Sequence, residues 1–174
     1  MSKLMTEPQH LARAFERHFT NPDAAAFAHF VTVTDGLTCA QAAAVPAPRF
    51  NSVWRVVNHT MFWMDGLRLA LMGAAADPHD YGMKDPGDGG WMPQPALTDA
   101  NWTADRLRAL DVCRATARVI EAIPQDQMEK PLEHWWNLTT DSAILSIFSH
   151  NSYHTAEIIG IRHMLGLWVD HPFV

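Results

Sequence analysis

Residues 149–168 read SHNSYHTAEIIGIRHMLGLW, and this stretch carries the clearest fold signal in the chain. Apolar or histidine side chains recur here every three or four residues, which is the spacing of one face of an α-helix. The residues of this seam are Ile147, His150, His154, Ile158, Ile161, Leu165 and Trp168. We therefore predict a long helix that is capped by Asp141 or Ser142 and carries two histidines on its buried side.

Helical patterns separated by Pro and Gly fill most of the remaining chain. The predicted helices run from Thr6 to about Thr20, over 23–36, over 38–45, from Ser52 to Gly73, and from Thr98 or Asp99 to just before Pro124. The one β-like run, VTVT at 31–34, is too short to set a fold. Three long helices and a split N-terminal one pack most simply as an all-α four-helix bundle, with one domain over residues 1–174.

A segment rich in Gly, Pro and Asp, from Gly73 to about Leu97, joins the second and third main helices. It is long for a compact domain, and loops of this length are usually lids, binding loops or partly disordered. We therefore expect this loop to shape a pocket.

Composition and charge exclude several classes of partner. The chain has 174 residues, 48% apolar and 18% charged, and a net charge of −6 without any run of Lys or Arg. We therefore expect no nucleic-acid or anionic-membrane partner. The first fifteen residues lack the apolar core of a signal peptide, and Cys39 and Cys113 lie far apart. A cytoplasmic protein with reduced thiols is the resulting expectation.

Three histidines lie on apolar helix faces. His150 and His154 are four residues apart and therefore neighbours on one face, and His59 lies on the apolar stripe of the 52–73 helix. Imidazole nitrogens bind zinc, nickel or iron. With ten histidines in the chain, roughly 0.6 such pairs arise by chance, so the spacing is a weak motif. Separate core histidines, each bonded to nearby backbone or side chains, are the alternative.

Other metal signatures are missing from the sequence. The run HNSYH has Asn151 where a zinc protease of the HExxH type has its glutamate. A di-iron bundle needs paired Glu-x-x-His motifs, and Glu7-Pro8-Gln9-His10 stands without a partner.

Three segments together resemble the DinB-like (YfiT-type) family. NSVWRVVNHTMFWMDGLRLALMG is similar to the family's second helix, LTCAQAAAVP to the lead-in before it, and HNSYHTAEIIGIRHMLG to the closing helix. The match in order and spacing covers about residues 22–168. The resemblance implies a four-helix bundle that binds one divalent metal ion, zinc or nickel, through His59, His150 and His154. The chain departs from the family pattern where Ala156 and Glu157 replace the usual Gly and Gln.

Several residues around these histidines are candidates for a supporting role. Glu157 orients a ligand imidazole, acts as a catalytic base, or faces solvent. His29 is a possible fourth ligand or an ordinary half-buried histidine, and His163 should face outward. Arg55, one turn before His59, either pairs with an acidic substrate group or is solvated.

Aromatic and acidic candidates have equally open roles. The tryptophans either wall a pocket above the metal or close the end of the bundle, and Asp65 either anchors a ligand or lies on the surface. The tryptophans in question are Trp91, Trp102, Trp135 and Trp136.

Three histidines leave a coordination position open, which is typical of a catalytic metal site. Together with the thiol-dependent transferases of the resembled family, this favours a metal-dependent thiol S-transferase, or else a hydrolase, acting on a small molecule. A low-molecular-weight thiol would be the cosubstrate, and a homodimer is expected from the many Trp and Met residues. A non-catalytic bundle, with metal as a fold clip or sensor, is the alternative function.

Overall fold

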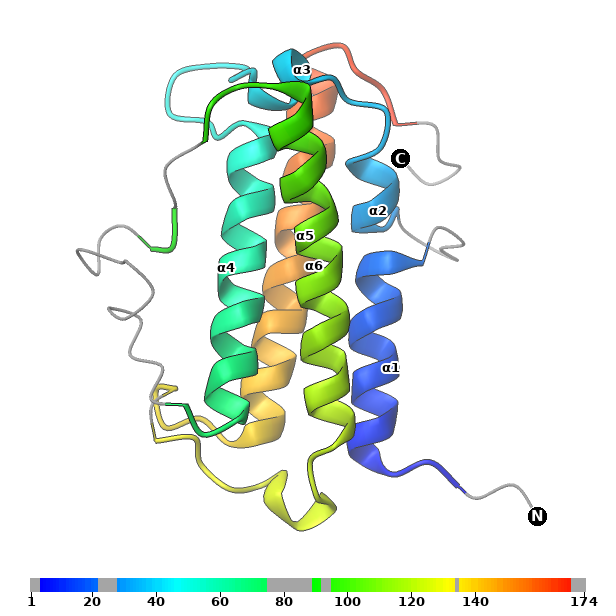
Figure 1. The fold of residues 1–174 in the computed structure, drawn as a ribbon, viewed down its shortest axis with the longest axis vertical. Coiled ribbons are helices and arrows are strands. Elements are labelled where there is room, and N and C mark those ends of the chain that lie inside the picture. The colour runs from blue at the N-terminus through cyan, green and yellow to red at the C-terminus, as the bar shows by residue number, and fades with distance from the viewer. Residues whose placement is uncertain (1–3, 22–27, 75–88, 92–94, 134, 170–174) are drawn as a thin grey trace.

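The structure is a computed structural model that describes residues 4–21, 28–74, 89–91, 95–133 and 135–169. Four long helices form an elongated bundle (Figure 1). They are α1 (Glu7–Thr20), α4 (Val53–Leu71), α5 (Asp99–Glu121) and α6 (Thr140–Met164). Short helices are α2 (Phe30–Val33), α3 (Cys39–Ala43) and the 3₁₀ turn η3 (Gln125–Gln127). The described residues contain no strand, only an isolated bridge between Pro131 and Thr139. The predicted all-α four-helix bundle is confirmed.

Helix starts follow the capping residues of the sequence with one exception. The Thr38 hydroxyl accepts a hydrogen bond from the Gln41 backbone N–H (3.3 Å), and Gln41 Oε1 accepts one from the Thr38 N–H (2.9 Å). Ser52 caps α4 by accepting the Arg55 N–H at 3.2 Å. These bonds satisfy N–H groups that have no partner within the first helical turn. The last helix begins earlier than predicted, because Thr139 is its N-cap.

The predicted helix over 23–36 is wrong in its extent. Within the described residues 28–36 only α2 is helical, because His29 has extended backbone angles (φ −82°, ψ 160°) and acts as its N-cap. Residues 22–27 lie outside the described part. The predicted end at Gly36 is also wrong, because α2 ends at Val33 with Thr34 as its C-cap. Gly36 lies in the turn that follows, with a φ of 69°, a left-handed conformation that glycine adopts without strain.

Helices α4 and α5 run in the same direction, from the α3 end of the bundle to the η3 end (Figure 1). The end of α4 and the start of α5 therefore lie at opposite ends of the bundle, and a 23-residue helix such as α5 is about 35 Å long. This geometry requires a long connection. Most of the predicted 73–97 loop itself lies outside the described residues.

The core extends along the whole bundle and is built from the predicted seams. Ile147, Ile158 and Ile161 of α6 are at most 4% exposed. Two residues expected in the core are exposed. Trp168, the last residue of the predicted seam, is 71% exposed. Leu107 is 51% exposed, although the helical spacing after Thr98 predicts an inner face of Leu107, Leu110, Cys113, Ala117 and Ile120. Leu107 is six residues before Cys113. At about 100° of helix rotation per residue, these six residues place the two side chains about 120° apart around α5. Trp168 lies beyond the end of α6 and so leaves its seam.

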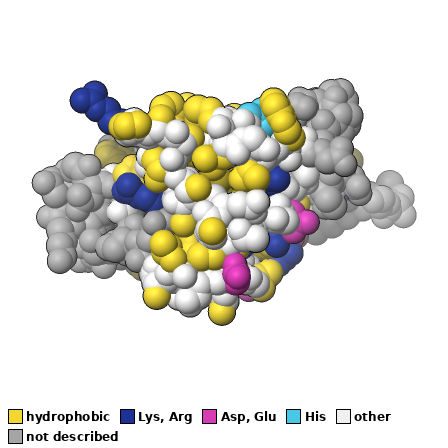
Figure 2. Space-filling view, turned by 90° about the horizontal axis from the view of Figure 1, so that it is seen from above, with side chains coloured by type: hydrophobic (Ala, Val, Ile, Leu, Met, Phe, Trp, Pro, Cys, Tyr) yellow, Lys and Arg dark blue, Asp and Glu magenta, His cyan; other side chains and the backbone are white. Residues whose placement is uncertain are grey.

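The α3 end of the bundle carries few charged side chains. Seen from above, its described side chains are mainly hydrophobic or neutral (Figure 2). Val45, Phe50 and Leu97 are each about half exposed. No described helix combines the length and the apolar character needed to cross a membrane.

Arg162 of α6 is a buried cation that joins three segments. Its guanidinium donates hydrogen bonds to the carbonyls of Val33 (2.8 Å), Asp35 (3.1 Å), Leu167 (3.2 Å) and Trp168 (3.3 Å). One side chain thus satisfies the end of α2 and the turn after α6, neither of which continues a helix.

Replacing Arg162 with Met should lower the free energy of unfolding by about 2–4 kcal/mol, because buried carbonyls lose charge-assisted donors. Urea denaturation of the purified protein measures this change. Arg108→Met, at an exposed position of α5, is the matched control and should change stability by less than about 0.5 kcal/mol. Equal effects of the two substitutions would contradict the role of Arg162.

Candidate metal centre

Three imidazoles meet where α4 packs against α6. His59 comes from α4, and His150 and His154 come from successive turns of α6. One ligand atom from each lies within 4.8 Å of the others. His59 and His154 are each 5% exposed, and His150 is half-buried. The structure therefore brings together the three residues that the sequence singled out.

Glu157 fixes the tautomer of His154. His154 Nδ1 lies 2.6 Å from Glu157 Oε2, and Asn51 Nδ2 donates to Glu157 Oε1 at 3.2 Å. Burial raises the pKa of Glu157, but these two hydrogen bonds outweigh it and the net effect lowers the pKa. Because an ionised carboxylate only accepts, Nδ1 of His154 is the donor in this contact, and Nε2 is the ring nitrogen that remains available to an ion.

The other two imidazoles are held neutral. Burial, with smaller contributions from His154 and His150, lowers the pKa of His59 to about 3. Burial and the neighbouring His154 lower the pKa of His150 to about 4. Neutral imidazole is the form that binds a metal ion, because protonation would occupy the lone pair.

The spacing of the nitrogens fits a single ion. His59 Nε2 and His150 Nε2 are 3.1 Å apart, and two nitrogen ligands of a tetrahedral zinc ion lie about 3.3 Å apart. The Nδ1 atoms of both rings are buried and make no hydrogen bond to a described residue. The Nε2 atoms of the two rings are thus directed at each other and not at separate partners, as expected for two ligands of one ion. The donor set therefore fits a divalent metal better than a metal-free core.

An aromatic wall covers one side of the histidines. The ring of Trp91 stacks on His59 with centroids 3.9 Å apart and planes 6° apart. Trp91 is held by its neighbours: Trp63 Nε1 donates to the Gly89 carbonyl at 3.1 Å, and Gly90 has a φ of 78°. A Cβ at Gly90 would come within 2.6 Å of the Phe62 ring, so this close approach requires glycine.

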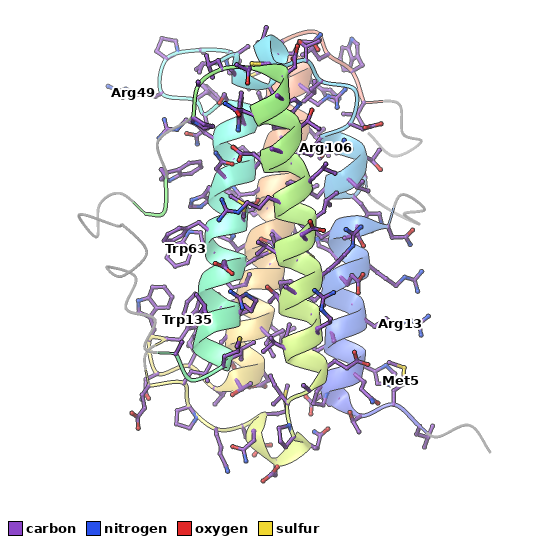
Figure 3. All side chains as sticks on the ribbon, in the orientation of Figure 1. Met5, Arg13, Arg49, Trp63, Arg106 and Trp135 are labelled. Atoms are coloured by element: carbon purple, nitrogen blue, oxygen red, sulfur yellow. The ribbon has the colours of Figure 1, made fainter. Side chains whose placement is uncertain are left out.

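The remaining tryptophans divide between the wall and the core. Trp63 and Trp135 point to the same side of α4 (Figure 3), with ring centroids 6.0 Å apart. Trp135 is buried, whereas Trp136 is 63% exposed. Trp102 closes the α3 end of the bundle, where its Nε1 donates to the Leu37 carbonyl at 2.8 Å.

Three other candidate residues lie outside the histidine group. His29 is buried, and its Nδ1 lies 2.6 Å from the His18 carbonyl, so its ring contacts α1 and not the centre. His163 is half-buried against Trp168, so the expected outward orientation is only partly correct. Asp65 forms an ion pair with Arg68 at 2.8 Å. Of the two expected roles, this contact fits a surface residue and not an anchor for a metal ligand.

The hydrogen bond between Asn51 and Glu157 was not indicated by the sequence. The Asn51 amide joins the start of α4 to Glu157 of α6. The one sequence signal of Asn51 is its place immediately before the Ser52 cap, and that place says nothing about a partner in α6.

These features define a helical bundle with a three-histidine centre, and comparison with known proteins gives the family. The DinB superfamily model matches residues 23–158 of the 174-residue chain. The chain therefore belongs to the DinB superfamily. No curated protein and no solved structure matches it significantly.

Removal of any one of the three imidazoles should weaken metal binding more than about 100-fold, since loss of a ligand costs more than loss of its supporting contacts. The test substitutes Ala for His59, His150 or His154 and measures zinc and nickel affinity by competition with a chromophoric chelator. His163→Ala, on the same helix as two of the ligands, is the control. Wild-type affinity in all four variants would exclude this centre.

Substitution of Glu157 separates positioning from catalysis. Glu157→Ala should reduce metal affinity about 10–100-fold, because His154 loses the acceptor that orients its ring. Glu157→Gln keeps an acceptor oxygen and should have a smaller effect. Glu121→Gln, exposed at the end of α5, is the control. Unchanged affinity in Glu157→Ala together with lost turnover would instead assign Glu157 as a catalytic base.

Proposed function

We propose that this protein is a divalent-metal-dependent enzyme that acts on a small molecule, with thiol S-transfer as its reaction and hydrolysis as the less favoured one. The observation that carries the proposal is the convergence of three imidazoles from only two helices. Three protein ligands leave room for a water or a substrate atom in the coordination sphere, unlike the closed four-ligand sites of structural zinc. Zinc or nickel suits this nitrogen donor set.

The contribution of the ion would be electrostatic. A divalent ion in this site lowers the pKa of a bound thiol or water, so that a nucleophile forms near neutral pH. In thiol transfer, the sulfur forms a bond to an electrophilic carbon while the bond between that carbon and its leaving group breaks. The thiol proton passes to solvent.

The side chains around the histidines hold the site and shield it. Both carboxylate oxygens of Glu157 are engaged, one by His154 and one by Asn51. Orientation of His154 is therefore the role we propose for Glu157, ahead of proton transfer. Trp91 covers His59 and so keeps water from one side of the reaction.

The fold clip, the alternative function, is less favoured because the hydrophobic core is continuous without the histidines. Large side chains such as Trp54, Met64 and Ile144 are at most 1% exposed. A bundle with such a core does not need a metal to fold.

The expectations for partners and location complete the proposal. We propose a cytoplasmic homodimer that takes a low-molecular-weight thiol as cosubstrate and binds neither nucleic acid nor membrane. The exposed side chains Val45, Phe50 and Leu97 at the α3 end are compatible with a second copy packing there.

Chelation separates the enzyme from the fold clip. The protein is loaded with zinc or nickel, and conjugation of 1-chloro-2,4-dinitrobenzene is followed with a panel of small thiols. A chelator should abolish turnover and should lower the free energy of unfolding only by mass action, by about 2.7 kcal/mol for metal at 100 times its Kd. Added metal should restore turnover.

Two results would contradict the proposal. Loss of the helical circular dichroism on chelation would identify a fold clip. A purified protein that neither contains nor takes up metal would remove the enzyme function altogether.

A further inference from the structure

Arg55 differs from the other arginines that the protein shields from water. Besides Arg55, three arginines in the described residues are half-buried or buried. Arg68 pairs with Asp65, Arg106 pairs with Asp35, and Arg162 donates to backbone carbonyls. The guanidinium of Arg55 forms no ion pair or hydrogen bond with a described residue; its contact is with the ring of Trp91, 5.6 Å from the centroid.

The position of Arg55 on α4 is unfavourable for a cation. It lies in the first turn, where the helix dipole is positive, and that turn contains no acidic residue. A cation that loses hydration at the positive end of a helix, without a negative partner, lowers the stability of the fold. Such local conflicts occur at functional sites, where a ligand supplies the missing charge.

Arg55 is adjacent to the candidate metal centre. It precedes His59 by four residues, so the two side chains are neighbours on one face of α4. Both contact the same tryptophan: Trp91 stacks on His59 at 3.9 Å and lies beneath the Arg55 guanidinium. The aromatic ring restrains the guanidinium and leaves its N–H groups available to a ligand.

We propose that Arg55 binds a carboxylate of the thiol cosubstrate, while the sulfur of that thiol is at the metal centre. The planar guanidinium matches a carboxylate with two parallel hydrogen bonds, which selects this group over a neutral amide or hydroxyl. The inference rests on the proposed function, since it names the class of thiol that this centre uses. Arg55 is thereby a specificity-determining residue.

The test compares 3-mercaptopropionate with 3-mercaptopropionamide, which have the same length and differ in charge. Protein loaded with nickel is titrated with each, and the thiolate-to-metal charge-transfer absorption gives one dissociation constant. Calorimetry gives a second one, because heat reports binding whether or not the sulfur reaches the metal. The wild type should prefer the carboxylate about tenfold, and Arg55→Gln should abolish the preference. Arg55→Lys should retain part of it.

Arg68→Gln is the matched control, because it removes one positive charge from the other end of the same helix. It should keep the full preference for the carboxylate. Circular dichroism and nickel content of each variant show that fold and metal site are intact.

The two readouts distinguish failure of the inference from failure of the proposed function. Charge-transfer bands with equal affinity for both thiols, or a preference that survives in Arg55→Gln, would overturn the role of Arg55 and leave the thiol function standing. Absence of a charge-transfer band with either thiol would overturn the thiol function. In that case calorimetry alone tests whether Arg55 binds the carboxylate. If neither thiol binds, or if both bind equally, the role of Arg55 is overturned as well.

Discussion

The packing of α4 against α6 is the constraint on which the site depends, because it brings His59 to the two histidines of α6. Burial and the neighbouring histidines lower the pKa values of His59 and His150 there. The Nε2 atoms of His59 and His150 lie 3.1 Å apart, close enough to share a hydrogen bond or to bind the same ion. The helix interface holds the rings together, because the apolar side chains above and below the rings fix the register of the two helices.

Helical periodicity predicted that three histidines lie on buried helix faces, and the family resemblance, not the periodicity, indicated that they meet at one site. His59, His150 and His154 lie on seams whose other members are mostly buried, and helical spacing determines which side chains face the core. Periodicity fails at Trp168 because the chain has left α6 there. It fails at Leu107 because repeated spacings of three residues rotate away from the buried face of the helix. Helix ends depend on caps that compete within two or three residues, which is why Thr139 rather than Asp141 begins α6.

Contacts between distant segments could not be predicted from the sequence. Asn51 and Glu157 are 106 residues apart, and only the packed bundle shows that they share a hydrogen bond. The Arg162 network likewise joins α6 to the end of α2 and to the turn at Leu167. A buried arginine has no periodic signature, since its position on a seam is indistinguishable from that of a residue at the edge of the apolar face.

The direction of α5 relative to α4 explains why a tryptophan from a loop reaches the metal centre. Two neighbouring helices that run the same way have the end of one and the start of the next at opposite ends of the bundle, so their connection must be long (Figure 1). Gly89 and Gly90 fasten one point of it to Trp63 and Phe62, and this contact places Trp91 against His59. The same topology that makes the crossover necessary therefore also supplies the wall of the site. A bundle with short hairpin connections at its ends would leave these histidines facing solvent on that side.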